Sequence, residues 1–509
     1  MECAMISGPS TQHPVTSQVL EEKIKVAIHP EYPEQTIAIG STLTEKGRKE
    51  LCALLRQNLD VFAWKPADMT GVPRHMAEHR LNVREGCPPV RQKKRGQAPE
   101  RNKAIQEEVE KLVDAGIMKE VHYHSWLSNP VMVKKHDGSW RMCVDFKDLN
   151  KACPQDGYPL PEIDWKVESL CGYPFKCFLD AYKGYHQIKM AEEDEEKIAF
   201  ITSQGIFCYT KMSFGLKNAG ATYQRLVDRA FQKQIRRNLE VYVDDLVIKS
   251  HTEEEIIRDI EEIFKTLRQI NMKLNLKKCT FGMQEGMFLG YKVSAEGLKV
   301  CLDKADAVLS LSSLGCRKDV QKLNGKLASL NRFMSKSAEK SLPFFKTLKK
   351  CTKKRDFQWT QEAEVAFKQM KKLIAELPML TAPKEKKELI IYLAAAKEAI
   401  SAVLMTERGG KQLPVYFVRR VLRGSEINYT PHGKIEISGR MLKWKFELEG
   451  YDIQYRPRTS IKGQILADFI VERPDEESLD EPMAEPEELP EPWTLFTDGS
   501  SCIDGSGAG

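Results

Sequence analysis

The sequence lacks the features of membrane, secreted and zinc-binding proteins. It has no run of about 18 apolar residues, so no segment is expected to span a membrane. Met1 to Ser17 show no basic-then-apolar signal pattern, which predicts an intracellular protein that is not secreted. The 13 cysteines are scattered singly, without a Cys-x-x-Cys pair or a Cys/His cluster. This usage predicts reduced thiols and argues against zinc knuckles or a disulfide scaffold.

The positive charge is unevenly distributed. The net charge is +6, yet Glu472 to Pro492 hold ten acids, one Arg and five prolines. Such a segment has too little apolar surface to fold and is expected to be a linker. The rest of the chain therefore carries +15. A body this basic suits a polyanionic partner, although charge alone is equally compatible with a solubilising surface.

A chain of 509 residues is expected to form roughly three or four domains. Residues 1–90 are polar, with Pro and Gly punctuation, and are expected to be a poorly structured leader with some docking elements. One helix is predicted there, over Glu45 to Phe62. The basic stretch Arg91 to Lys103 is either a phosphate-contacting entry to a nucleic-acid site or a solvated linker.

Hydrophobic spacing predicts alternating strands and helices further along the chain. A hairpin is expected over Val131 to Val144, with His136 to Ser139 at its tip. The remaining expected elements are a helix from Pro99 to near Gly116, a helix over Asn218–Arg236, strands over Leu239–Val243 and Leu246–Ile248, and helices over Glu253–Ile270 and Asp319–Met334.

Three carboxylates stand at the ends of apolar strands. Asp244 and Asp245 form a pair between two such segments, a pattern that alone is typical of a solvated turn. Asp180 ends another apolar strand and changes that interpretation. Hard oxygen ligands from separate strands suit Mg²⁺. Two such ions can activate a 3′-hydroxyl and stabilise a pyrophosphate leaving group.

Five motifs carry a resemblance to a known family. In their order and residues they resemble the reverse transcriptases of plant gypsy-type LTR retrotransposons, over roughly residues 70 to 509. A generic two-metal nuclease would explain neither Trp140–Asn150 nor Phe214–Ala219. The motifs are Trp140–Asn150, Asp180–Gln187, Phe214–Ala219, Tyr242–Asp245 and Phe288–Tyr291.

The resemblance implies an α+β right-hand polymerase followed by an RNase H-like α/β segment. Its domain boundaries would be a leader over 1–90 after an absent protease, fingers and palm over 91–300, a thumb over 301–355, a degenerate RNase H-like domain over 356–471, the linker over 472–492 and the truncated start of a second RNase H over 493–509. No protease motif or integrase zinc cluster occurs.

The resemblance also implies which residues bind metal. Asp180, Asp244 and Asp245 would be catalytic and hold two Mg²⁺ ions, for which Mn²⁺ substitutes. The carbonyl of Ala181 would be an extra ligand.

Further implied roles concern the nucleotide and the primer. Arg141 and Lys135 would grip the triphosphate, as guanidinium groups do well; a solvated hairpin cation is an equal alternative for Lys135. Tyr185 would pack under the incoming sugar and exclude a 2′-hydroxyl, and Phe214 would line the same pocket. The hairpin Phe288, Leu289, Gly290 and Tyr291 would position the primer end. Ser213 departs from the family, which usually has Pro there.

The RNase H-like region lacks most of the four acids of catalytic versions. The first position falls in Leu393–Lys397, which has no acid, and the second falls on Gly433. Ten residues separate Tyr429 from Arg440 where the family places two helices and a strand, which indicates a deletion. The residual acids are Asp468 there and Asp498 in the second segment, so RNase H activity is not expected.

The expected function is RNA-directed DNA polymerisation. The expected partners are an RNA template, a DNA primer, an RNA–DNA hybrid and dNTPs, in a cytoplasmic particle or the nucleus. The alternative from a different class is an inactive retroelement remnant that only binds nucleic acid. The intact carboxylate triad favours the enzyme, and the deletion favours the remnant.

Overall fold

The structure is a computed structural model that describes residues 23–134, 138–312, 314, 316–334, 359–384, 387–395, 399–422 and 428. The chain divides into two compact units. The first comprises Met1–Leu289 with Val293–Ala295, and the second comprises Gly290–Lys292 with Glu296–Gly509.

A six-stranded sheet is the centre of the first unit. Neighbouring strands are antiparallel except β13 and β2, which run parallel, so the sheet is mixed. The strand order is β1-β2-β13-β7-β12-β11. The strands are β1 (Lys23–Ala27), β2 (Thr36–Gly40), β7 (Phe175–Asp180), β11 (Leu239–Tyr242), β12 (Asp245–Ser250) and β13 (Thr280–Met283).

The expectation of a poorly structured leader is wrong from Lys23 onward. Strands β1 and β2 form a hairpin, and β2 extends the sheet through β13. The physical cause is the alternation in Thr36–Gly40, which places Ile37 and Ile39 in the core with no exposed surface. Helix α1 (Glu45–Gln57) begins at Thr44, whose hydroxyl caps the helix by accepting from the Gly47 N–H, and ends before the predicted Phe62.

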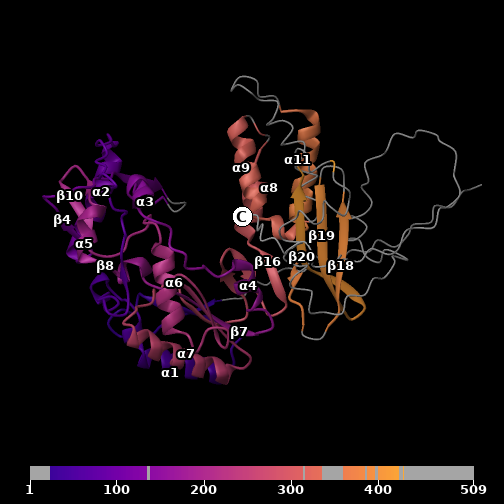
Figure 1. The fold of residues 1–509 in the computed structure, drawn as a ribbon. Coiled ribbons are helices and arrows are strands. Elements are labelled where there is room, and N and C mark those ends of the chain that lie inside the picture. Colours follow the sequence, from indigo (N-terminus) through magenta and orange to yellow (C-terminus); the bar gives the residue numbers. More distant parts are fainter. Residues whose placement is uncertain are drawn as a thin grey trace, which may run out of the picture. The chain divides into compact units, whose positions relative to one another are not determined.

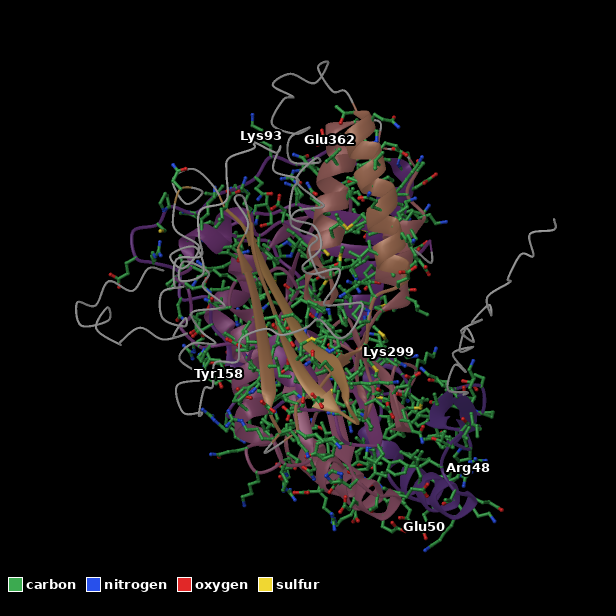
Figure 2. The ribbon with its side chains drawn as sticks, turned by 90° about the vertical axis from the view of Figure 1, so that its right-hand side faces the viewer. Arg48, Glu50, Lys93, Tyr158, Lys299 and Glu362 are labelled. Atoms are coloured by element: carbon green, nitrogen blue, oxygen red, sulfur yellow. The ribbon has the colours of Figure 1, made fainter. Side chains whose placement is uncertain are left out.

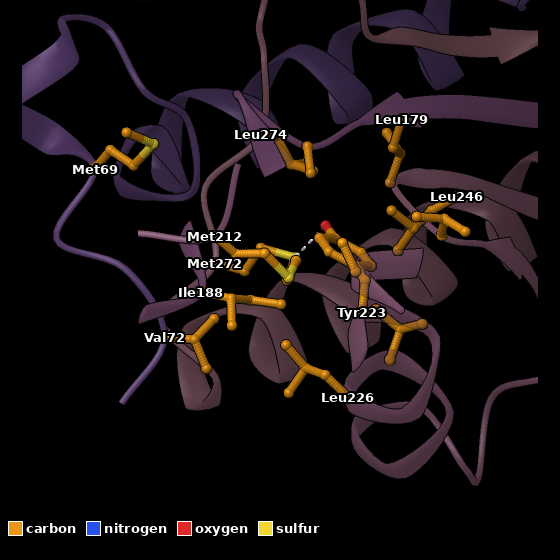
Figure 3. Packing of buried hydrophobic residues seen from close by; sticks show 14 of the residues in the cluster. Met69, Val72, Leu179, Ile188, Met212, Tyr223, Leu226, Leu246, Met272 and Leu274 are labelled. Atoms are coloured by element: carbon orange, nitrogen blue, oxygen red, sulfur yellow. Dashed lines mark hydrogen bonds between the residues drawn. The ribbon is translucent and has the colours of Figure 1, made fainter. Parts of the chain in front are cut away.

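Amphipathic helices cover the sheet. Helix α7 (Glu253–Gln269) is close to its predicted span and buries the apolar residues at helical spacing that predicted it. Helix α6 (Ala219–Ala230) is shorter than predicted. Helices α1 and α7 lie side by side in Figure 1, and Arg48 and Glu50 mark α1 in Figure 2. The hydroxyl of Thr44, at the start of α1, donates to the carboxylate of Glu253, the first residue of α7. Figure 3 shows the core, in which the Tyr223 hydroxyl donates to the Met272 sulfur at 3.4 Å.

Smaller sheets and short helices complete the first unit. Pro99 is the first residue of α2, where its missing N–H costs nothing. The predicted hairpin is confirmed as β5 and β6, and its tip, residues 135–137, lies outside the described residues. The elements are β3 (Glu78–His79), α2 (Pro99–Asp114), β4 (Met118–Glu120), β5 (Pro130–Lys134), β6 (Trp140–Val144), α3 (Lys147–Ala152), α4 (Ile163–Glu168), β8 (Lys189–Met190), α5 (Glu192–Glu195), β9 (Phe200–Ile201), β10 (Ile206–Tyr209) and β14 (Gly286–Phe288).

The basic stretch is partly tied to this unit. Arg95 pairs with Asp145 at 2.6 Å, whereas Lys93, labelled in Figure 2, is exposed.

The second unit combines helices with an antiparallel sheet. Helices α8, α9 and α11 share a core with Val320, Leu323 and Phe367 buried in it, and α9 ends before the predicted Met334. Strands β18, β19 and β20 form the sheet. The elements are β15 (Tyr291–Val293), β16 (Gly297–Val300), α8 (Leu302–Leu309), α9 (Arg317–Ala328), α11 (Gln361–Ala375), β17 (Leu380–Thr381), β18 (Leu389–Ala395), β19 (Ala399–Arg408) and β20 (Lys411–Val421).

Two further observations concern the described residues. None of the helices there has the length and apolar character needed to cross a bilayer. The ten cysteines in that part of the chain are all free thiols.

Candidate active site

Three carboxylates meet at one end of the central sheet. Asp180 is the last residue of β7 and Asp245 the first of β12, and the two are directly opposed in the antiparallel register. Asp244 precedes Asp245 in the turn from β11, and its carbonyl accepts from the Ala181 N–H at 3.3 Å. The structure thus brings together the acids that the sequence singled out.

The turn that carries Asp244 is strained and specifically held. Val243 has a φ of +53°, a conformation that β-branched residues rarely adopt. Its buried N–H donates to Oε1 of Gln224 at 2.8 Å, and Gln224, from α6, is itself completely buried. The amide of Gln224 donates in turn to Asp228 at 2.9 Å. The sequence analysis missed Gln224, because nothing in the helical pattern distinguishes it from a surface polar residue.

The carboxylates are held in an environment that disfavours their charge. Burial, followed by the charges of Asp244 and Asp180, raises the pKa of Asp245 to about 6. Burial also raises the pKa of Asp244, with the Asp180 charge adding to it. A cation bound among these groups would offset both causes.

The ammonium group of Lys278 forms an ion pair with Asp180. Its Nζ lies 2.9 Å from Oδ2 of Asp180, and Asn275 Nδ2 lies 3.4 Å from Oδ1. Within the described ranges, no three His, Cys, Asp or Glu side chains are already arranged to hold a metal ion. The donors nevertheless fit a hard divalent cation, because they are adjacent carboxylate oxygens whose charge is only partly neutralised. Asp180 would have to share its carboxylate between the metal and Lys278.

The two aromatic residues predicted to face the nucleotide do lie together. Tyr185 is half-buried in a 3₁₀ turn over Gly184–Gln187, and its ring centroid is 4.4 Å from that of Phe214. The fully buried Tyr223 packs on Tyr185 at 5.8 Å. Burial, then the Asp244 charge, raises the pKa of Tyr185 to about 12. Phe214 remains 49% exposed and is open to a ligand.

The remaining nucleotide-binding candidates differ in their surroundings. Arg141 is exposed on β6, opposite Val133, and pairs with no acid in the described part of the chain. Ala181 is buried directly after Asp180. Lys135 lies outside the described residues.

The predicted primer hairpin spans the division of the chain. Phe288 is buried and ends β14, Leu289 and Gly290 have φ values of +48° and +81°, and Tyr291 begins β15. Leu289 belongs to the first compact unit and Gly290 to the second. A tight turn is therefore present where the motif indicated one.

The RNase H-like region is described only in part. Leu393 to Ala395 belong to β18, opposite Ile400 to Ala402, with no acid among them. Asp468, Asp498, Gly433 and the interval from Tyr429 to Arg440 lie outside the described residues.

Family comparisons agree with this arrangement. A family model described as "Reverse transcriptase (RNA-dependent DNA polymerase)" matches residues 133–293. A second, described as "RNase H-like domain found in reverse transcriptase", matches residues 359–441. Residues 133–293 are therefore similar to reverse transcriptase domains, and residues 359–441 are similar to the RNase H-like domains found in reverse transcriptases.

Two polyproteins show similarity to most of the chain. The Retrovirus-related Pol polyprotein from transposon 297 of Drosophila melanogaster is 32% identical over 330 residues, covering 64% of this chain and 31% of the relative. The Transposon Tf2-3 polyprotein of Schizosaccharomyces pombe is 28% identical over 355 residues, covering 69% of this chain and 26% of the relative. The chain thus spans about a third or less of the length of these relatives.

Solved structures support the fold. The foamy viral protease-reverse transcriptase in complex with an RNA/DNA hybrid has a TM-score of 0.71 and 18% identity, covering 93% of this chain and 67% of that one. The foamy viral protease-reverse transcriptase "dRH" in complex with double-stranded DNA has a TM-score of 0.68 and 20% identity, covering 80% of this chain and 70% of that one. The α+β right-hand polymerase architecture expected from the sequence is confirmed.

Proposed function

We propose that this chain, with its reverse transcriptase domain at residues 133–293, is the RNA-directed DNA polymerase of an LTR retrotransposon Pol polyprotein. The observation that carries the proposal is the meeting of Asp180, Asp244 and Asp245 at one end of the central sheet. The plant gypsy-type lineage, the dNTP substrates and an intracellular location in a cytoplasmic particle or the nucleus belong to the same proposal.

Asp180, Asp244 and Asp245 would hold the two Mg²⁺ ions. When bound, these ions activate the primer 3′-hydroxyl and stabilise the pyrophosphate leaving group. The protein prepares the site by fixing the carboxylates in register across β7 and β12 and by burying them, which strengthens their interaction with a cation. Lys278, 2.9 Å from Asp180, balances part of the charge of that carboxylate.

The other residues bind and select the nucleotide. Arg141 is exposed and without an acidic partner in the described residues, so its guanidinium is available for a triphosphate. The Tyr185–Phe214 pair forms an aromatic surface beside Asp244. A ribose 2′-hydroxyl would meet the Tyr185 ring there, whereas a deoxyribose would pack on it.

RNase H cleavage is not part of the proposed function. Cleaving an RNA–DNA hybrid by a two-metal route requires several clustered carboxylates. The first expected position, in β18, has Leu393, Ala394 and Ala395 in place of an acid. In the sequence only Asp468 remains in the first segment and Asp498 in the second.

A single preparation tests both parts of the proposal. The purified 509-residue chain is given a primed RNA template, dNTPs and Mg²⁺, and separately a labelled RNA–DNA hybrid with Mn²⁺. Metal-dependent primer extension without hybrid cleavage is expected. Binding of the primed template without any extension would instead favour the inactive remnant. Hybrid cleavage abolished by Asp468→Asn or Asp498→Asn would contradict the reading of the missing acids.

A further inference from the structure

One buried side chain connects the loop after Asp180 to the distant segment around Lys273. Gln187 has no exposed surface. Its amide nitrogen donates to the carbonyls of Tyr182 and Lys273, both at 2.8 Å. Its amide oxygen accepts from the Lys273 N–H, also at 2.8 Å. All these partners are main-chain groups, so Gln187 fixes the path of the backbone and not the position of another side chain.

The segment around Lys273 is directly bonded to the catalytic loop. The Tyr182 N–H donates to the Lys273 carbonyl at 2.9 Å, and the Asn275 N–H donates to the Asp180 carbonyl at 2.8 Å. Between them, Leu274 forms a bridge with Ala181. Residues 273–275 therefore act as a short strand against residues 180–182, and they lead to Lys278, the cationic partner of Asp180.

The opposite side of this short strand is held by residues that precede the reverse transcriptase match. Leu274 donates to the Val61 carbonyl at 2.9 Å and accepts from the Ala63 N–H at 3.0 Å. The Val72 N–H donates to the carbonyl of Gln187 at 2.7 Å. Val72 and Leu274 lie with Ile188 and Met272 in the same apolar cluster in Figure 3. Residues 61–72 thus brace the catalytic loop from outside the matched domain.

Gly71, within the segment 61–72, lies very close to the main chain of Gln187. Its φ is +86°, and a Cβ atom added there would lie 2.8 Å from the Gln187 carbonyl oxygen. Because the Val72 N–H is bonded to the same oxygen, moving either group aside would disturb that hydrogen bond. Any larger side chain at 71 would press directly on Gln187.

From these contacts we infer that Gln187, braced by residues 61–72, is a positioning residue that sets the metal-binding geometry of Asp180. This inference rests on the proposed function, since it assigns a role within the same site. Outer-shell groups that orient metal ligands commonly change metal affinity by about 10–100-fold when removed. The segment 61–72, although outside the matched domain, then belongs to the catalytic unit.

The test compares two pairs of variants in the full-length chain. Gln187→Met removes all three side-chain hydrogen bonds while keeping the length of the side chain. Its control is Gln234→Met, at another buried glutamine, whose amide bonds to Glu262 and Thr266. Gly71→Ala presses on Gln187, and its control is Gly86→Ala, which has a similar φ of +76° but no atom within 4 Å of the added Cβ.

Mn²⁺ binding is measured by electron paramagnetic resonance without nucleic acid, together with melting temperature and primer-template affinity. Gln187→Met and Gly71→Ala should weaken Mn²⁺ binding by about tenfold or more, with primer-template affinity unchanged. The controls should bind Mn²⁺ like the wild type. Equal Mn²⁺ affinity in Gln187→Met and wild type, or equal losses in both members of each pair, would overturn the inference. A wild-type chain that neither binds Mn²⁺ nor extends primers would instead contradict the proposed function.

Discussion

Two hairpin turns in this protein reach left-handed backbone conformations by different means. The turn from β19 to β20 uses Gly409 and Gly410, with φ values of +57° and +71° and open space around both. The turn from β11 to β12 places Val243 at +53°. The first follows the ordinary preference of glycine for tight hairpins. The turn from β11 to β12 departs from that preference, because a β-branched residue takes the left-handed conformation.

The difference indicates where the fold has been arranged for chemistry. At the glycine turn no side chain is needed to hold the backbone. At Val243, a buried glutamine on another element supplies the hydrogen bond that holds the strained residue. Strain of this kind persists only when the surroundings determine it, and it concentrates at functional sites. The rigidity of the carboxylate turn thus comes from α6, whose Gln224 lies 19 residues before Val243.

The largest effect of breaking this support is expected for Gln224→Met. The buried Val243 N–H would lose its partner, at a cost of about 1–3 kcal/mol, and the turn carrying Asp244 would relax. A small displacement of reacting groups can lower a rate by about a hundredfold. Single-turnover primer extension measures this. Gln234→Met is the control, and equal rates for the two variants would show that the bond to Val243 does not matter.

Tyr185→Val tests the aromatic surface beside the strained turn. Removal of the ring should lower discrimination against ribonucleotides by about tenfold or more, since loss of one steric contact is worth about 1–3 kcal/mol. Use of dNTPs should be largely retained. Competition between rNTPs and dNTPs in primer extension gives the ratio. Tyr185→Phe keeps the ring and should keep the discrimination; unchanged discrimination in Tyr185→Val would exclude Tyr185 as the sugar gate.

Gly409→Val tests the glycine turn from β19 to β20. Among the described residues, no atom lies within 4 Å of a Cβ added at Gly409, so nothing there would offset the positive φ, and a β-branched side chain should cost about 1–2 kcal/mol of stability. The rate of primer extension should not change, because the turn lies in the sheet of the second unit. Thermal denaturation measures the first quantity. A melting temperature equal to that of the wild type would show that this turn also tolerates valine, and the contrast with Val243 would disappear.

The smallest expected effect is a stabilisation by Asp245→Asn in the absence of metal. Because the folded-state pKa of Asp245 is raised to about 6, its ionisation opposes folding above that pH, and this penalty disappears as the pH falls toward the unfolded value. In EDTA at pH 8 the variant should therefore melt about 2–4 °C above the wild type. At pH 4 the difference should vanish. Glu407→Gln, beside the glycine turn, should melt like the wild type, and a lower melting temperature of Asp245→Asn at pH 8 would contradict the charge repulsion.

Much of the site could be predicted because its signals are local. Apolar strands ending in Asp180 and flanking Asp244 and Asp245 are visible in the sequence, and an antiparallel register then brings them together. The helix α7 and the hairpin β5–β6 also follow from spacing alone. Tyr185 and Phe214 were paired through their motifs, and their rings do pack together.

The missed features depend on contacts between distant segments. The pairing of β2 with β13 joins residues about 240 positions apart, and no local pattern specifies that partner. Gln187 stood inside a recognised motif, but its role depends on Lys273 and on Val72. Lys278 lies in the run Lys277-Lys278, where the sequence does not distinguish the cation that contacts Asp180. Side-chain roles of this kind become visible only once the backbone path is known.

The most direct measurement is primer extension on an RNA template by Asp244→Asn beside the wild type, in Mg²⁺. Loss of one metal-binding carboxylate should remove several kcal/mol of transition-state stabilisation, or about a thousandfold in rate. The variant should retain the circular dichroism spectrum and the primer-template affinity of the wild type. Extension by Asp244→Asn at a rate within about tenfold of the wild type would contradict the assignment of this carboxylate cluster as the catalytic centre.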